Sequence, residues 1–477
     1  MGTAASTRER DAIHTEMETA AVSSSKRARL GGSDRLSDLP DCLLHDILSL
    51  LGCRQAVRTS ALSRRWRHLW RSMTCLNIDQ REFQRSGVPP PLDVCQWDSF
   101  EDMADSLLST SITTPSAPLD AFRLHLVDGS KKTGVDRWIR RGLARRPAAV
   151  DIHYGYGYVG RVCWPDTSRL ASGATCRLTR LRLFGVQLSP SFGRDLGDQC
   201  PVLEDLHIEN CREDFCTVAS PTLKSFALVS PSDYSYRSSA LVLAVPHLAS
   251  LRLVLPFSGY RGYAVATSEN EVLASLVQAS ICIKDMDDEV QRNRRVMKPH
   301  KLDFLKSMCN FLACIPNVRN LHLSGFTTTA LLGKEPQEFQ VFHDLKTLLL
   351  SRCDLGVSYQ ALTSILRNAQ NLENVGMHFC RFLERPKRRG KAQPKSKPSK
   401  RRNSTLLEYK NLKVVEIKHE TNSTAPLENI FLEISKGMPK EMPLTRWHRL
   451  EKLSKTGPMT IVRLRLFRTE NGEVKSN

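Results

Sequence analysis

The chain of 477 residues has no long uninterrupted apolar run. Its longest apolar stretch, Ala240 to Phe257, is broken by Pro246, His247 and Arg252, so we expect no membrane-spanning helix. No apolar segment stands near the N-terminus, and we therefore expect no secretory signal. A chain on the reducing side of the membrane keeps its thiols free, and the 14 cysteines, which include no CxxC pair, fit that expectation.

Motifs of catalysis, nucleotide binding and metal binding are missing as well. The sequence contains no GxxxxGK[ST], HExxH or GxSxG, and Cys200, His207, Cys211 and Cys216 do not have the spacing of a common zinc site. The one literal GxGxxG begins at Gly155, but a proline soon follows it where a dinucleotide-binding turn requires a helix. We therefore predict a protein that is not an enzyme and has no cofactor and no metal.

The net charge of +19 is concentrated rather than spread. The segment 385–402 holds ten Lys or Arg and no acid, is punctuated by proline and glycine, and is expected to be a disordered loop. Two interpretations remain open, a solvated charged loop and a nuclear localisation signal or polyanion contact. The residues that would form the signal are Arg385, Lys387, Arg388, Arg389, Lys400, Arg401 and Arg402.

The segment from Asp34 to Trp70 predicts three short helices with more apolar surface than they can bury among themselves. One continuous stripe at helical spacing consists of Pro40, Leu43, Leu44, Ile47, Leu48 and Leu51. Gly52 ends this first helix, and Ser63 can cap a last helix that places Trp66 and Trp70 on one face. The excess of apolar surface predicts a partner.

This segment resembles an F-box, the helical module that docks on the Skp adaptor of cullin-type (SCF) ubiquitin ligases. The resemblance rests on Leu39-Pro40, Ile47-Leu48, Val57, Ser60, Leu62-Ser63 and Arg65-Trp66-Arg67 with Trp70. The sequence of this segment is similar to that of plant F-box proteins with leucine-rich repeats. It implies a Skp-binding surface composed of Leu39, Pro40, Leu43, Leu44, Ile47, Leu48, Leu51, Val57, Ser60, Leu62, Trp66 and Trp70. Arginines at the rim would favour an acidic partner.

After this segment, a sequence motif of the form LxxLxL occurs eight times. Its centres at Leu181, Leu206, Phe226 and Leu251 are 25, 20 and 25 residues apart, and three later centres at 321, 348 and 375 are 27 apart. That is the period of leucine-rich repeats, in which each repeat supplies a short strand and stacking builds a solenoid. Two degenerate members are predicted at 122–126 and 150–152.

These patterns predict an α/β fold, a small three-helix N-terminal module followed by an irregular leucine-rich-repeat solenoid with a parallel sheet. The expected parts are a disordered tail (1–33), the F-box (34–79), a linker (80–118), the solenoid (119–440) with its basic insert (385–402), and a C-terminal cap or tail (441–477). Between repeats, 271–283 is expected to be helix and loop. The chain after about 405 loosely resembles the C-terminal FBD region of the same family.

Alternate residues of each repeat strand should point outward and form a binding surface. The candidates for substrate contact are Arg182, His207, Arg252 and His322. The resemblance implies a substrate-recognition subunit that binds the Skp adaptor and a cullin scaffold, holds a protein substrate, and works in the nucleus, the cytoplasm or both. The alternative is a basic solenoid that binds nucleic acid or a nuclear partner without a role in degradation. The outward residues do not form a basic stripe, so nucleic acid is not the expected ligand.

Overall fold

The chain folds into two compact units, Met1–Leu188 and Ser189–Asn477. The computed structural model describes residues 36, 38–83, 94–109, 118–127, 134–155, 162–166, 174–213, 215–230, 241–258, 261–262, 265–268, 271–285, 299–325, 341–357, 365–383, 411–420 and 459–465. The predicted disordered tail (1–33) and basic insert (385–402) lie outside these residues. Within them, no helix is both long and apolar enough to cross a membrane.

The first unit begins with a helical module, residues 36–72. It contains α2 (Asp41–Ser49), α3 (Cys53–Arg58) and the 3-10 helices η1 (Thr59–Ala61) and η2 (Leu69–Ser72). Pro40 is the N-cap of α2 and accepts the first backbone hydrogen bonds, from the N–H groups of Leu43 and Leu44. The third predicted helix is absent from 63–68, where the chain forms turns before η2.

Four strands of the first unit form a parallel sheet: β1 (Cys75–Asp79), β2 (Ala121–Leu126), β3 (Ala149–Tyr154) and β4 (Arg180–Phe184). Strands β2 and β3 are the two degenerate repeats predicted from the sequence. Strand β1, which belongs to the region predicted as F-box, pairs with β2 and was not expected in the sheet. The unit also contains η3 (Gln80–Phe83), α5 (Val135–Ala144) and the short β5 (Gln187–Leu188).

The predicted linker, 80–118, contains a helix of sixteen residues, α4 (Val94–Ser109). Its Trp97, Phe100, Ala104 and Leu108 are buried, and the Phe100 ring lies 5.5 Å from Phe83 and 5.6 Å from a tryptophan of α5, in edge-to-face contacts. Apolar residues at helical spacing drive this packing. The linker prediction is therefore corrected, because α4 contributes to the core of the first unit.

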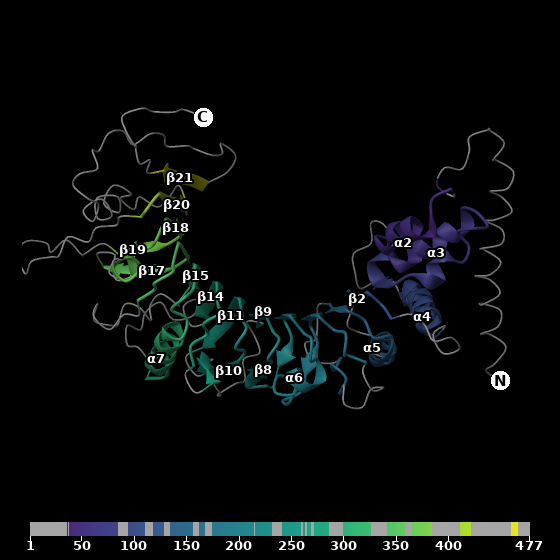
Figure 1. The fold of residues 1–477 in the computed structure, drawn as a ribbon, viewed down its shortest axis with the longest axis horizontal. Helices are drawn as coiled ribbons and strands as arrows, with labels where there is room; N and C mark the ends of the chain where they lie inside the picture. Colours follow the sequence, from purple (N-terminus) through teal and green to yellow (C-terminus); the bar gives the residue numbers. More distant parts are fainter. Residues whose placement is uncertain are drawn as a thin grey trace, which may run out of the picture. The chain divides into compact units, whose positions relative to one another are not determined.

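The second unit is built on a longer parallel sheet, ordered β6, β9, β11, β14, β15, β16, β18 and β20, with β21 antiparallel at its end (Figure 1). The bounds are β6 (Asp205–Glu209), β9 (Ser225–Val229), β11 (Ser250–Ser258), β14 (Gln278–Asp285), β15 (Asn320–Gly325), β16 (Thr347–Ser351), β18 (Asn374–His378), β20 (Val414–Glu420) and β21 (Met459–Arg465). The α/β class and the parallel-sheet solenoid are thus confirmed. Strand β21 is the described part of the predicted C-terminal cap.

Shorter elements make up the rest of the second unit. A three-stranded parallel sheet joins β8 (Thr217–Ala219), β10 (Leu241–Ala244) and β13 (Val265–Thr267), and β17 (Asp354–Val357) pairs with β19 (Arg381–Leu383). Helix α7 (Pro299–Ala313) contacts β13, and α6 (Leu196–Gln199) contacts β8. The remaining short strands are β7 (Arg212–Glu213) and β12 (Arg261–Gly262).

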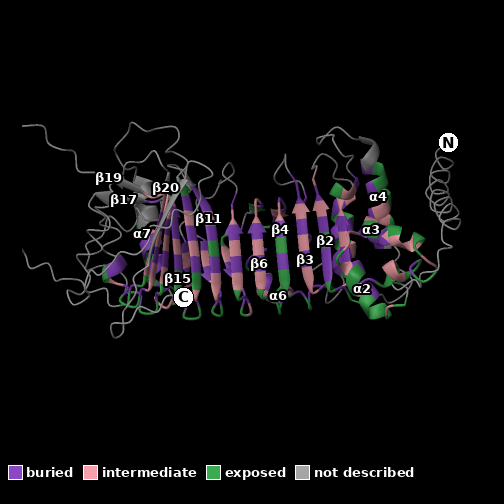
Figure 2. Ribbon diagram, turned by 90° about the horizontal axis from the view of Figure 1, so that it is seen from above, coloured by how far each residue is buried: buried purple, intermediate pink, exposed green. Residues whose placement is uncertain are grey.

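The stretch 271–283, predicted as helix and loop, instead ends in strand β14. This strand lies between β11 and β15, with Ala279 beside Leu251 on one side and Leu321 on the other. It is a further repeat, in which Ala279 stands at a position that is usually leucine, while Leu276 and a following isoleucine remain buried. Alternate buried and half-buried residues along the main strands are visible in Figure 2.

Candidate docking surface and outer sheet face

The helical module exposes a concentrated set of apolar side chains. Eight large hydrophobic side chains are exposed among the described residues, and five of them lie within 36–62: Leu36, Leu43, Ile47, Leu50 and Leu62. Leu50 is 85% exposed and Leu62 is 64% exposed. Exposed apolar groups gathered on one small module mark a protein-binding surface more clearly than the same groups scattered singly.

The residues predicted to bind the Skp adaptor fall into three sets. Leu44, Leu48 and Trp66 are buried inside the module, and Leu39, Leu51, Val57, Ser60 and Trp70 are half-buried. Pro40, Leu43, Ile47 and Leu62 are exposed. The first set can affect a partner only through the fold, whereas the last set is available for direct contact.

Charged groups lie close to the exposed apolar set. Arg65 forms an ion pair with Asp41 of α2, with 2.6 Å between the guanidinium nitrogen and the carboxylate oxygen. Arg64 and Arg67, in the same turns of 64–68, are exposed. Because exposed ion pairs contribute little to stability, the pair of Arg65 and Asp41 adds little to holding the module together.

Glu82 holds the start of α3 from outside the helical module. Its carboxylate accepts a hydrogen bond from the backbone N–H of Arg54 at 3.0 Å, and the Arg54 guanidinium bonds back to the Glu82 carbonyl and lies 4.3 Å above the Phe83 ring. Burial raises the pKa of Glu82, and the backbone hydrogen bonds oppose that rise. A Cβ on Gly52 would lie 1.4 Å from a Glu82 carboxylate oxygen, so Gly52 leaves the space for this cap.

Outward residues of the second unit align in rows across its sheet. The pairing register places His207, Ala227, Arg252, Ser280, His322, Leu349, Gly376 and Glu416 in one row. Three of the four predicted substrate residues therefore share a row. The fourth, Arg182, lies in a row of the first unit with Asn77, Arg123 and Asp151.

Comparisons with known proteins match this architecture. The F-box domain family matches residues 36–77. The chain is 45% identical over 422 residues to the rice (Oryza sativa subsp. japonica) protein named meiotic F-box protein MOF, which covers 87% of this chain and 85% of the relative. An Arabidopsis thaliana F-box/LRR-repeat protein is 27% identical over 380 residues (74% and 94% covered), and an F-box/FBD/LRR-repeat protein of the same plant is 26% identical over 387 residues (73% and 80%).

The chain belongs to the plant F-box/leucine-rich-repeat family. Its F-box match ends at residue 77, inside strand β1. The F-box and the first strand of the repeat sheet are therefore continuous in this chain, without a linker between them. The chain that follows β1 supplies η3, and with it the Glu82 that caps α3.

Two histidines on the outer face of the repeats act as neutral hydrogen-bonding groups. His322 lies between two serines, with its Nδ1 3.1 Å from Ser280 Oγ and its Nε2 3.0 Å from Ser351 Oγ. Burial lowers the pKa of His322, and His378 and Arg252 lower it further. Burial also lowers the pKa of His378, although its 2.9 Å contact with Glu416 opposes the shift. Both pKa shifts favour the uncharged ring.

A stack of three rings crosses the sheet of the first unit. The His125 and His153 ring centroids are 4.1 Å apart with an interplanar angle of 3°, and the Phe184 ring continues the stack 4.0 Å from His153. Burial lowers the pKa of His125 to about 4, helped by the neighbouring His153, while Asp79 acts in the opposite direction. Sequence spacing does not predict this stack, because it depends on the register of three strands.

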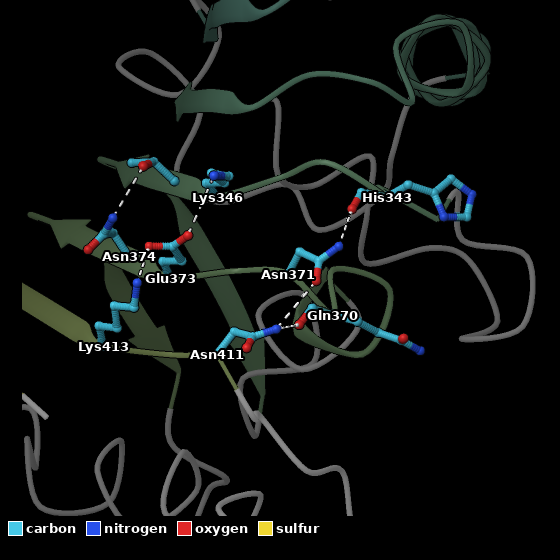
Figure 3. A network of polar contacts seen from close by, with 9 residues as sticks. His343, Lys346, Gln370, Asn371, Glu373, Asn374, Asn411 and Lys413 are labelled. Carbon is cyan, nitrogen blue, oxygen red and sulfur yellow. Dashed lines mark hydrogen bonds and ion pairs between the residues drawn. The ribbon is translucent and has the colours of Figure 1, made fainter. Parts of the chain in front are cut away.

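The turns that lead into the repeat strands carry a polar ladder (Figure 3). Glu373 lies between Lys346 and Lys413 of the adjacent repeats, with nitrogen–oxygen distances of 3.7 and 2.7 Å. Asn371 and Asn411 donate side-chain hydrogen bonds to carbonyls of preceding repeats, at 2.7 and 3.2 Å. The sequence signal for this ladder was available, since an asparagine directly precedes the leucine run of both repeats.

Proposed function

We propose that this chain is the substrate-recognition subunit of an SCF-type ubiquitin ligase, docking on a Skp adaptor through its F-box. The observation that carries the proposal is the exposed apolar set of the F-box, above all Leu43, Ile47 and Leu62. Burial of such a set against the helices of a partner, with the nearby arginines at the rim, is a common form of protein recognition. Membership of the F-box family supports the same role.

In this role the chain contributes proximity, and the transfer of ubiquitin belongs to other subunits on the cullin scaffold. A protein substrate on the outer face of the repeats would be held near the ligase, which raises its effective concentration there. Arg182, His207, Arg252 and His322 are proposed substrate contacts. The name of the rice relative contains the word meiotic, so reproductive tissue is a reasonable source for a substrate search.

The test is co-purification of the full chain with the Skp adaptor and cullin. We expect Leu43→Asp with Ile47→Asp to abolish recovery of both partners, because each change puts a charge on the exposed apolar set. Val202→Asp with Val272→Asp is the matched control, since these two valines are 40% and 52% exposed outside the F-box. Equal recovery with both double variants would refute the proposed docking, provided that both melt at the wild-type temperature.

We also propose that the basic insert directs the chain to the nucleus. The motivating residues are the clusters Arg385–Arg389 and Lys400–Arg402, which lie outside the described residues. A fluorescent fusion with these lysines and arginines changed to glutamine should lose nuclear enrichment. An unchanged distribution would leave the insert without a localisation role.

A further inference from the structure

The outer face of the repeats carries few charges over five adjacent strands, where Arg252 and Lys284 are the exposed charged residues among the described positions. Strands β9, β11, β14, β15 and β16 present fifteen outward positions in register between residues 225 and 351. Arg252 is the one charged residue among these fifteen, and the others are small apolar or uncharged polar side chains and the neutral His322. Arg252 is exposed and has no ion-pair partner among the described residues. An unpaired cation among mostly neutral side chains, with Lys284 further along β14 as the second cation of this face, favours an anionic partner.

A hollow lies on the same face, over strands β16, β18 and β20. Its volume is about 340 Å³, at the lower end of the range for ligand pockets, and its lining includes Leu349, Gly376, His378 and Glu416. Gly376 opens it, because a Cβ there would lie 2.7 Å from Leu349 Cδ1. His378 and Lys418 already contact Glu416, each at 2.9 Å. With its polar rim satisfied internally, the hollow suits an apolar or aromatic side chain.

Arg252 and Gly376 occupy the same row, four strands apart. Four strand spacings of about 4.8 Å give about 19 Å, which an extended peptide spans with about six residues at roughly 3.3 Å each. His322, between the two points, offers hydrogen bonding without charge. The row therefore has a cationic site for a carboxylate, a polar middle and an apolar anchor at peptide spacing.

We propose that the repeats bind an extended acidic peptide segment, with a carboxylate at Arg252 and an apolar or aromatic side chain in the hollow over Gly376, about six residues apart. The inference rests on the proposed function, because it gives the chemical class of the protein substrate. A single arginine forms a bidentate pair with a carboxylate, whereas phosphate recognition generally uses several arginines. A nucleic acid would require a row of cations, which these five strands do not have.

The probe is a library of random twelve-residue peptides displayed on phage and selected on the immobilised full chain. We expect enriched peptides to contain Asp or Glu and an aromatic or large aliphatic residue about six positions apart. Enrichment of basic peptides, or of peptides with only one of the two features, would overturn the proposal. Adaptor and cullin are absent from the selection, so its outcome is independent of the docking test on the F-box.

Variants then separate the two contacts for an enriched peptide. Arg252→Glu and Gly376→Val should each weaken binding by at least about tenfold. Two matched controls should change affinity less than about twofold: Arg319→Glu, at an exposed arginine in the turn before β15, and Ala244→Val, the same type of enlargement on strand β10 of the three-stranded sheet. Equal weakening by variants and controls would refute the site.

A second peptide carries phosphoserine in place of the acidic residue. Binding by the phosphoserine peptide alone would refute recognition of a carboxylate.

Discussion

At the scale of single residues, several side chains have roles that only the three-dimensional structure reveals. Gly52 was expected to end a helix, but its absent side chain leaves room for the Glu82 carboxylate at the start of α3. Burial raises the pKa of the Cys53 thiol to about 12, which keeps the thiol protonated in the core of the F-box. Sequence spacing does not predict the cap on α3, because Glu82 lies 28 residues from Arg54, whose backbone N–H donates the hydrogen bond to its carboxylate.

Gly52→Ala should therefore destabilise the F-box. Its Cβ would displace the Glu82 carboxylate, and we expect the free energy of unfolding to fall by about 1–3 kcal/mol, measured by chemical denaturation. The same substitution in a Glu82→Ala background should cost markedly less, because the displaced group is gone. An equal cost in both backgrounds would contradict the clash as the cause.

The ring stack of the first unit predicts a pH dependence. The pKa of His125 falls from 6.5 to about 4 on folding, so the unfolded chain binds a proton more readily and stability falls as the pH is lowered from about 6.5 to about 4. The expected loss is on the order of 1–2 kcal/mol, less than the full shift implies because the ring is partly solvated.

Thermal melts across this pH range measure the effect. His125→Phe, which keeps a ring in the stack, should flatten the pH dependence. Phe184→Leu removes a ring without removing a titrating group, so it should lower stability at every pH and preserve the slope. A wild-type slope in His125→Phe would argue against this histidine as the origin.

At the scale of elements, the repeats that could be predicted are those with large apolar residues at both strand positions. Leu206 and Ile208, for example, point into the core as the alternation required. Strand β14 was missed because Ala279 weakens its pattern, and pairing on both sides imposes the strand all the same. Helix α4 was missed although Trp97, Phe100 and Ala104 have helical spacing, because the neighbouring prolines suggested a linker.

The additional repeat at β14 can be tested by a core substitution. Leu276 is buried ahead of β14, and Leu276→Ala should lower the free energy of unfolding by about 2–5 kcal/mol. Val272→Ala, at a side chain that is 52% exposed in the same segment, should cost less than about 0.5 kcal/mol. Similar costs for the two changes would mean that Leu276 does not contribute to the repeat core.

At the scale of the whole molecule, the net charge of +19 arises largely from one basic segment and does not describe the charge of the repeat sheet. Ten of the basic residues stand in 385–402, while the outer face between β9 and β16 has two exposed cations among its described residues, Arg252 and Lys284. The charge of the chain and the chemistry of its repeat surface are therefore separate properties. Sequence composition gives the first, and only strand register gives the second.

Deletion of 385–402 should reduce the affinity of the chain for heparin and for random DNA, with a shallower dependence on salt. The thermal stability should stay close to that of the wild type, because the deleted residues contain no part of the LxxLxL repeat motif. Retention of wild-type DNA binding after the deletion would favour the alternative of a nucleic-acid-binding solenoid.

The contact between Glu82 and α3 also bears on how such modules are shuffled between proteins. A fragment cut where the family match stops, at residue 77, would lose the acid that caps α3 and the aromatic ring beneath Arg54. Grafted onto an unrelated receptor, the fragment would lack the residues that hold the start of α3, Glu82 and Phe83. Recombination that preserves function should therefore cut after η3, so that the inherited piece is the F-box together with the first strand of its repeats.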